Sequence, residues 1–323
     1  MSILPVIKVE LKRNLWVAWV AVLLVVIYMG GNLGSELMSD AFDSMLDFTA
    51  GYSHFVPVYG VLFTCCGWWV LLFVFVQFGR DSLLFKQALP YTDKKLLLSK
   101  FTAFLAVLGI FLAAYACVCA VLFHKFDYVF YIMRHTGPDL FGNGWLSPFS
   151  MVIAAVTAAL FAAALYWFLA LCCCLCRNSV HGCMLGIFFA AAAFAFNDFL
   201  SIVSDGERPF SVLIAQWLTT VSPHAYAYTE TVIWVMVSLV ILAVAVPLCV
   251  KLYGGGESNH PLFRYRHTDK VCIAAAAVFF GSVGHTLLGF GENSLWLSFV
   301  IGAVVGAAAG IIINCLVKRR AAK

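Results

Sequence analysis

The chain has 323 residues, of which 63% are hydrophobic and only 11% are charged. This composition lies well outside that of ordinary soluble domains and indicates a membrane protein. The net charge of +4 reflects how the bases are distributed around the apolar runs, so we expect no nucleic acid partner.

Eight apolar runs are long enough to cross a bilayer, because about 20 mostly apolar residues span roughly 30 Å of hydrocarbon. No Lys, Arg, Asp or Glu lies in the interior of any run. We therefore predict an all-α polytopic membrane protein with about eight transmembrane helices. The runs lie at 15–33, 55–78, 101–123, 149–175, 180–196, 231–250, 271–290 and 295–317.

The charged residues between these runs predict the orientation. With the N-terminus inside, 17 of the 20 Lys and Arg residues lie on the cytoplasmic side, and only five of the 16 acidic residues do. Such an excess of inner bases is typical of the positive-inside rule. Both termini are therefore predicted to be cytoplasmic, in a multi-pass protein of the cell membrane, most simply a bacterial plasma membrane.

Residues 1–14 precede the first run and have an amphipathic pattern. Ile3, Leu4, Ile7 and Leu11 recur at the spacing of one helical face, and the other face carries bases. This pattern predicts an interfacial helix on the inner leaflet, although a solvated tail is an alternative. No small-residue cleavage site follows, so we interpret the segment as uncleaved rather than as a secretory signal.

The connection at 79–100, between the second and third spans, predicts a stiff hairpin. Residues 80–89 are compatible with a helix, and Pro90 ends that helix by pushing the preceding residue out of the α region. Thr92 can cap a second helix, whose first turn would hold Asp93 at the positive end of the dipole. That helix is predicted to run without interruption into the third span.

Two later connections between the apolar runs predict how the rest of the chain is divided. Residues 197–230 contain two short apolar stretches that cannot cross a bilayer, so we expect them to lie on or dip into the outer face. Residues 251–270 form a Gly-rich and then basic-aromatic cytoplasmic loop. The predicted domains are a six-span core at 15–250 and an added pair of spans with a basic tail at 271–323.

The hairpin sequence "LPYTDKKLLLSKF" carries a family resemblance. Together with an amphipathic segment before the first span, it resembles the membrane subunits of ABC-2 type ATP-binding-cassette exporters. The resemblance covers roughly residues 1–250. The family core has six spans, so the last two are extra here, and the outer stretch at 197–230 matches only in placement.

The resemblance implies a permease subunit that works with separate cytoplasmic ATPase subunits and with a second permease subunit, identical or similar. The chain has no G-x-x-x-x-G-K-[ST] motif of its own, so we expect no enzyme and no bound cofactor. ATP and Mg²⁺ would bind the partner ATPase. The hairpin residues expected to contact that ATPase are Phe85, Lys86, Leu89, Pro90, Tyr91, Thr92, Asp93, Lys94 and Lys95.

By the same resemblance, the second and fifth spans would line the substrate path and the subunit interface. Phe55, Tyr59, Phe63 and Val70 on the second span, with Cys66 and Thr64 nearby, form an apolar and aromatic stripe. That stripe favours an amphipathic or hydrophobic cargo, such as a lipid-like molecule, peptide or drug.

Several alternatives stay open. Lys86, Lys94, Lys95 and Lys100 could simply hold the loop against anionic membrane lipids. A secondary transporter is a rival, although such proteins usually carry ionisable residues within their spans. A non-energised membrane binding or immunity protein is a third possibility.

Other features have structural interpretations. Cys172, Cys173, Cys174 and Cys176 cannot converge on one tetrahedral metal from adjacent helical positions, so we expect packing and no metal. His285 is a polar group within a span, suited to hydrogen bonding with a neighbouring helix or to a proton relay. Gly302, Gly306 and Gly310 form two G-x-x-x-G units, which favour close helix packing within the chain over contact with a second subunit.

Overall fold

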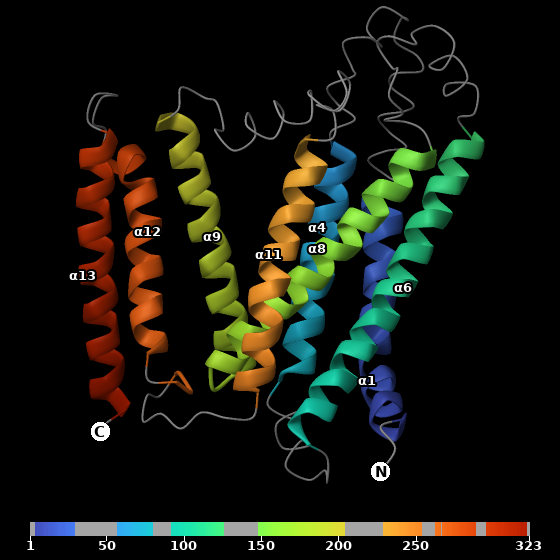
Figure 1. Cartoon of the computed structure of the whole chain (residues 1–323), viewed down its shortest axis with the longest axis horizontal. Coiled ribbons are helices and arrows are strands. Elements are labelled where there is room, and N and C mark those ends of the chain that lie inside the picture. The colour runs from blue at the N-terminus through green and yellow to red at the C-terminus, as the bar shows by residue number, and fades with distance from the viewer. Residues whose placement is uncertain are drawn as a thin grey trace, which may run out of the picture. The chain divides into compact units, whose positions relative to one another are not determined.

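A computed structural model of the chain describes residues 4–29, 57–79, 92–125, 148–203, 229–253, 262–265, 267–288 and 295–321. Within these ranges the chain forms eight α-helices of 21 to 33 residues and no extended strand (Figure 1). The helices are α1 (Leu4–Leu24, followed by the π-helical turn η1, Val25–Met29), α4 (Pro57–Gln77), α6 (Asp93–Lys125), α8 (Pro148–Leu175), α9 (Ser179–Val203), α11 (Thr229–Leu252), α12 (Thr268–Leu288) and α13 (Leu295–Ala321).

Five of these helices, α6, α8, α9, α11 and α13, are long and apolar enough to cross a membrane. A bilayer offers no hydrogen-bonding solvent, so its spanning segments must satisfy their backbone groups internally, as helices do. The helical fold and these five segments support a polytopic membrane protein. The count of eight spans and the cytoplasmic termini stay predictions.

The chain divides into two compact units. The first comprises Met1–Gln77, Lys86–Trp167 and Glu230–Val244, and the second comprises Phe78–Phe85, Phe168–Thr229 and Ala245–Lys323. The division falls inside α8 and α11, and in the second unit α9 packs with α12. The predicted boundary near residue 250, which concerns topology and function, stays a prediction.

In the first unit, α1 packs against both α4 and α6 (Figure 1). Cys65 near the middle of α4 lies 3.8 Å from the Leu24 carbonyl at the end of α1, and Gln77 at the end of α4 bonds to Lys100 near the start of α6, which in turn binds Glu10 near the start of α1. Helix α4 therefore runs antiparallel to α1 and α6, which are parallel to each other. This is the direction that alternate crossings of a membrane require.

Aromatic side chains fill the middle of this unit. The Trp69 ring stacks on Phe104 at a centroid separation of 5.5 Å, and Phe104 stacks on Tyr166 at 4.4 Å. Trp69, Phe73, Phe104 and Tyr166 are all fully buried. Offset and edge-on aromatic pairs add about 0.5–1.5 kcal/mol beyond their buried area, so they fix the spacing of α4, α6 and α8.

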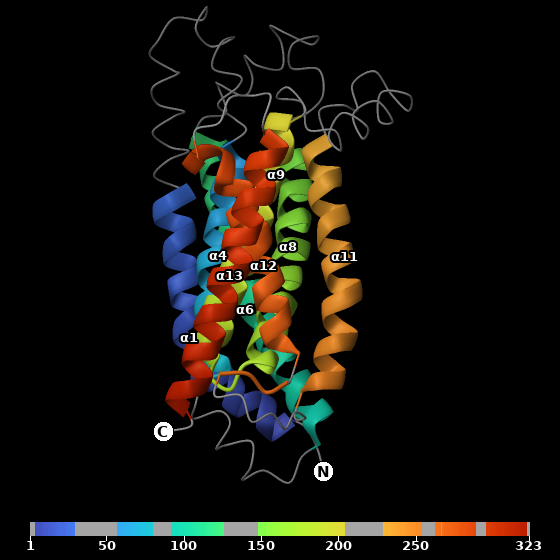
Figure 2. The ribbon, with the colours of Figure 1, turned by 90° about the vertical axis from the view of Figure 1, so that its left-hand side faces the viewer.

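In the second unit, α12 and α13 form an antiparallel pair (Figure 2). Gly302 faces the Phe280 carbonyl, Gly306 faces the Ala276 carbonyl, and Gly310 faces Ile273. A Cβ atom added at Gly306 would lie 2.5 Å from the Ala276 oxygen, well inside normal contact distance. The G-x-x-x-G glycines thus lie against α12 of the same chain, because only a residue without a Cβ allows so close an approach.

The turn between α8 and α9 is bound to a distant segment of the second unit. Cys176 forms an isolated antiparallel bridge with Phe263. The Arg177 amide donates to the Leu262 carbonyl at 3.0 Å, and the Arg264 amide donates to the Leu175 carbonyl at 2.9 Å. Part of the predicted cytoplasmic loop 251–270 is therefore tied to the end of α8.

A charged contact joins the start of α12 to the end of α13. Lys318 Nζ lies 3.0 Å from Asp269 Oδ2, and Asn314 Nδ2 donates to the same oxygen at 3.1 Å. Partial burial would raise the pKa of Asp269, but the hydrogen bonds from Lys318 and Asn314 outweigh it and hold that pKa below its ordinary value. The contact therefore favours the ionised carboxylate.

We expect Gly302→Ala to weaken the α12–α13 pair by about 1–3 kcal/mol, because its Cβ would overlap the Phe280 backbone. Thermal unfolding of the purified protein in detergent measures the effect. Gly109→Ala in α6 is the matched control, since an added Cβ there meets nothing within 4 Å. Equal melting temperatures for the two variants would contradict the packing argument.

The Asp269 contact predicts a pH dependence. The pKa of Asp269 is lower in the folded protein, so its contribution to stability is present above the ordinary carboxyl pKa of about 4 and is lost as pH falls through the lowered value. The melting temperature of wild type should thus fall more steeply below pH 4 than that of Asp269→Asn. Parallel pH profiles would count against the contact.

Candidate functional site: a buried polar cluster between α4 and α6

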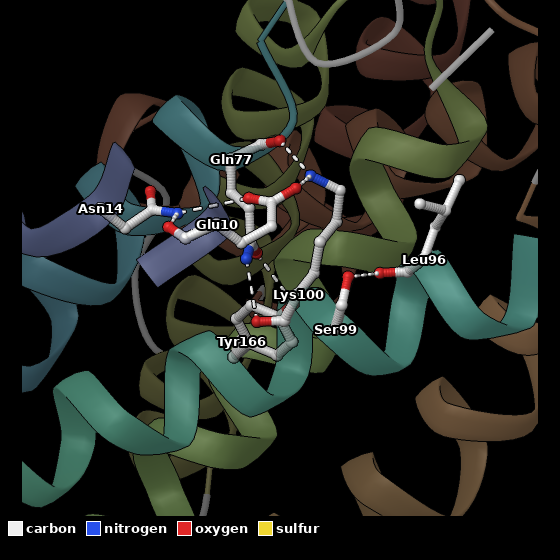
Figure 3. A network of polar contacts seen from close by, with 7 residues as sticks. All are labelled: Glu10, Asn14, Gln77, Leu96, Ser99, Lys100 and Tyr166. Atoms are coloured by element: carbon white, nitrogen blue, oxygen red, sulfur yellow. Dashed lines mark hydrogen bonds and ion pairs between the residues drawn. The ribbon is translucent and has the colours of Figure 1, made fainter. Parts of the chain in front are cut away.

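Polar side chains gather where α4 ends and α6 begins, beside the connection that carries the predicted hairpin. The cluster consists of Glu10 and Asn14 from α1, Gln77 from α4, Ser99 and Lys100 from α6, and Tyr166 from α8 (Figure 3). All of these residues belong to the first unit, and all are buried. We refer to them as the polar cluster.

An ion pair lies at its centre. Lys100 Nζ is 3.0 Å from Glu10 Oε1, and the two side chains are only 5% and 4% exposed. The same ammonium donates to the Gln77 carbonyl at 2.7 Å. The last carbonyls of a helix lack partners within it, so Lys100 satisfies the end of α4 while its charge pairs with α1.

The Gln77 side chain in turn bonds to the backbone of Lys100. Its Nε2 donates to the Lys100 carbonyl at 2.9 Å, and its Oε1 accepts the Tyr166 hydroxyl at 2.9 Å. Lys100 and Gln77 therefore exchange hydrogen bonds between side chain and backbone in both directions. This reciprocal pair fixes the register of α4 against α6, and Tyr166 extends it to α8.

Two further residues complete the cluster. Asn14 Nδ2 donates to the Glu10 carbonyl at 2.8 Å and lies 3.4 Å from Glu10 Oε2, which orients the carboxylate towards Lys100. Ser99 Oγ donates to the Leu96 carbonyl at 2.7 Å. Asn14 Oδ1 is buried without a hydrogen-bond partner among the described residues.

The aromatic core closes one side of the cluster. Tyr166 stacks on Phe104 and also contacts Phe73, with ring centroids 6.2 Å apart. Water is thus kept away from the Glu10–Lys100 pair, and the pair interacts through a medium of low polarity. Removing one partner of such a pair leaves a buried unpaired charge and typically costs about 3–5 kcal/mol.

These contacts make the polar cluster a connection between helices. The Lys100 ammonium binds the Glu10 carboxylate and the Gln77 carbonyl, and the Asn14 side chain also contacts that carboxylate. Its hydrogen bonds join three helices through Gln77 and Lys100, and a fourth through Tyr166. A displacement of the α4–α6 connection must therefore move α1 and α8 as well, or break the ion pair.

The predicted hairpin is described only in part. Phe85, Lys86, Leu89, Pro90 and Tyr91 lie outside the described residues. Thr92 occupies the N-cap position, since its carbonyl accepts the Leu96 amide at 3.1 Å, and α6 begins at Asp93. Thr92, Asp93, Lys94 and Lys95 are exposed, so they lie on a surface that a partner can reach.

Lys100 differs from what the sequence suggested. We grouped it with the bases that could bind anionic lipid, but the structure buries it against Glu10. Both residues were predicted to lie in helices, and they do. Their pairing was not predicted, because Glu10 and Lys100 lie 90 positions apart in sequence.

The described residues of the predicted substrate stripe do not share one exposed face of α4. Phe55 lies outside the described residues, as do the side chains of Tyr59 and Phe63. Thr64 is exposed, whereas Cys66 and Val70 are fully buried in the first unit. The described part of α4 instead exposes Trp68 and Phe75.

The cysteines of the described helices do not gather into a site of three or more metal ligands. Within the described ranges, no group of three or more His, Cys, Asp or Glu side chains could hold a metal ion. Cys172 and Cys176 pack with Leu185 and phenylalanines, as expected for small apolar filler. The His285 side chain lies outside the described residues.

Sequence reasoning missed most of the polar cluster. Val6, Glu10, Asn14 and Val17 form the buried stripe of α1, at spacings of four, four and three. This stripe runs beside the apolar face formed by Leu4, Ile7 and Leu11, and Leu4 is exposed. A carboxylate and an amide four positions apart at the start of a membrane helix were the available signal.

No protein-family model matches this chain, and no curated protein or solved structure does so either.

We expect Lys100→Met to lower the free energy of unfolding by about 3–5 kcal/mol, because it leaves the Glu10 carboxylate buried and unpaired. The double variant Glu10→Gln/Lys100→Met should recover much of the loss. Thermal unfolding in detergent measures both variants. Lys94→Met, at an exposed position on the same helix, is the control, and a Lys100→Met protein as stable as this control would refute the ion pair.

Proposed function

We propose that this chain is the membrane subunit of an ATP-binding-cassette exporter. It would pair with a second permease subunit and with two cytoplasmic ATPases that bind ATP and Mg²⁺. Closure of the ATPases would move the hairpin at 79–100, and the hairpin would move the membrane helices between inward-open and outward-open states. The chain itself would hydrolyse nothing.

The polar cluster is the observation that carries this proposal. A motion generated in a soluble partner reaches a bilayer only through stiff elements, and the α4–α6 connection joins two helices whose facing ends are bonded to each other. Gln77 ends one helix and is bonded to Lys100, while the other begins with a capped turn and continues as α6. A push on the connection therefore acts on four joined helices.

The exposed residues at the start of α6 fit a partner surface. Thr92, Asp93, Lys94 and Lys95 are exposed and are followed by the buried Leu96 and Leu97. Polar contacts of this kind typically surround a few hydrophobic anchors at protein interfaces. Phe85, Leu89 and Tyr91 of the hairpin would supply those anchors.

The apolar surface of α4 supports an amphipathic or hydrophobic cargo. Trp68 is 63% exposed and Phe75 is 41% exposed, so the side of α4 that carries Thr64 presents large apolar groups. In the resembling family this helix lines the substrate path. A path with such a lining suits lipid-like molecules, peptides or drugs better than small ions.

The buried Glu10–Lys100 pair gives some support to a second function, a secondary transporter driven by an ion gradient. Ionisable residues inside membrane helices often belong to ion or proton pathways. Here, however, both charges are matched within the chain. Transport in proteoliposomes that persists when ionophores collapse the ion gradients, but requires ATP and a partner ATPase, would favour the exporter.

The coupling role predicts the behaviour of hairpin variants. Pro90→Ala and Tyr91→Asp should insert normally but reduce both the stimulation of a co-purified ATPase and transport by about 10-fold or more, the loss expected for an interface anchor worth 1.4 kcal/mol or more. Lys251→Ala, exposed at the end of α11, is the control outside the hairpin. Full ATPase stimulation and transport by both hairpin variants would refute the assignment.

A further inference from the structure

The second unit contains a thiol pair that the proposed function does not use. Cys174 on α8 and Cys249 on α11 are 75 positions apart in sequence, yet their sulfurs lie 3.7 Å from each other. Both side chains are buried, with exposures of 2% and 0%. Adjacent cysteines on one helix cannot converge on a ligand, whereas these two come from different helices and face each other.

Backbone contacts hold the ends of these two helices together. The Arg264 amide donates to the Leu175 carbonyl, next to Cys174, at 2.9 Å. One residue further along, the Tyr265 hydroxyl donates to the Leu252 carbonyl on α11 at 2.7 Å. The segment 262–265 therefore connects α8 to α11 close to the thiols, and the sulfurs are preorganised as a pair.

The neighbouring cysteines have other partners. Cys173 Sγ lies 3.9 Å from the Ser179 carbonyl, and Cys173 also hydrogen-bonds with Cys183. A Cβ added at Gly182 would lie 2.8 Å from Cys173 Sγ. The backbone of α9 therefore lies directly against this sulfur, and the contact is possible because residue 182 is a glycine. Cys172 and Cys176 belong to the apolar cluster around Leu185.

We propose that Cys174 and Cys249 form a two-coordinate site for a soft monovalent d¹⁰ cation, Cu⁺ or its analogue Ag⁺. Soft thiolates select such ions, and two thiolates in line satisfy them. Zn²⁺ almost always takes four ligands, and no group of three or more ligating side chains gathers in the described part of the chain. The ligand number therefore distinguishes the two metals.

The geometry needs only a small adjustment. A metal between two sulfurs requires a separation of roughly twice a metal–sulfur bond, about 4.5 Å on the scale of Zn–S bonds. The sulfurs are 3.7 Å apart, so rotation of the two side chains opens the site. On binding, the two S–H bonds break, two metal–sulfur bonds form and two protons leave, with no change in oxidation state.

A disulfide is the competing chemistry of a thiol pair. It forms through attack by a thiolate, and thiols buried in apolar surroundings are poor sources of thiolate. Metal coordination deprotonates a thiol directly and needs no oxidant. These points favour the metal over the disulfide.

The test uses the purified, reduced full-length protein in detergent under anaerobic conditions. Cu⁺ is titrated against a chromophoric Cu⁺ chelator, and we expect the protein to withhold one equivalent. Cys174→Ser and Cys249→Ser should each weaken binding by about 100-fold. Cys65→Ser and Cys66→Ser, at buried cysteines of α4, are the matched controls and should bind as wild type does.

Two further measurements separate this site from the alternatives. X-ray absorption of the Cu⁺-loaded protein should show two sulfur neighbours, and Cys249→Met should retain more Cu⁺ than Cys249→Ser because a thioether is also a soft ligand. Unchanged Cu⁺ binding in both serine variants would overturn the proposal. Displacement of Cu⁺ by excess Zn²⁺, or a Cys174–Cys249 disulfide in place of bound metal, would also overturn it.

Discussion

The Glu10–Lys100 ion pair is the constraint on which the first unit depends. Two charges buried away from water are stable only while each neutralises the other, and their 3.0 Å contact joins α1 to α6. Buried ion pairs add little net stability compared with apolar residues of the same size, but they penalise any arrangement that separates them. The pair therefore specifies one register of α1 on α6, and Gln77 transmits that register to α4 and α8.

The two units achieve close packing in different ways. In the first, large rings such as Trp69, Phe104 and Tyr166 set the distances between helices, and directional hydrogen bonds set the register. In the second, glycines and cysteines bring backbones together, as Gly302 and Gly306 do for α12 and α13. Association between helices in lipid lacks a hydrophobic drive, so small residues and polar contacts take its place. The same closeness brings Cys174 into contact with Cys249.

Apolar run length was a reliable guide to the helices, since each of the eight predicted runs overlaps a helix in the described ranges. The start of α6 at Asp93 also followed from local chemistry, namely a capping residue after a proline. The polar cluster could not be predicted in the same way, because it depends on pairings between Glu10, Gln77, Lys100 and Tyr166 that are remote in sequence. Local patterns placed Lys100 on a helix that enters the third span, and only the packing of α1 against α6 explains why its charge is buried there.

The continuity of α6 has a consequence for how the helix meets the membrane. At about 1.5 Å per residue its 33 residues extend for roughly 50 Å, whereas the hydrocarbon layer is only about 30 Å thick. The surplus of about 20 Å must be taken up by tilt or by projection into the aqueous phase. Lys100 lies seven residues after Asp93, roughly 10 Å along the axis. If half of the surplus projects on the Asp93 side, the charged contact with α1 lies at the depth at which headgroups give way to acyl chains. A helix held at that depth would turn about the Glu10–Lys100 contact. The part of α6 before Lys100 is short and the part after it is long, so a small movement of the N-terminal end would become a larger movement at the far leaflet.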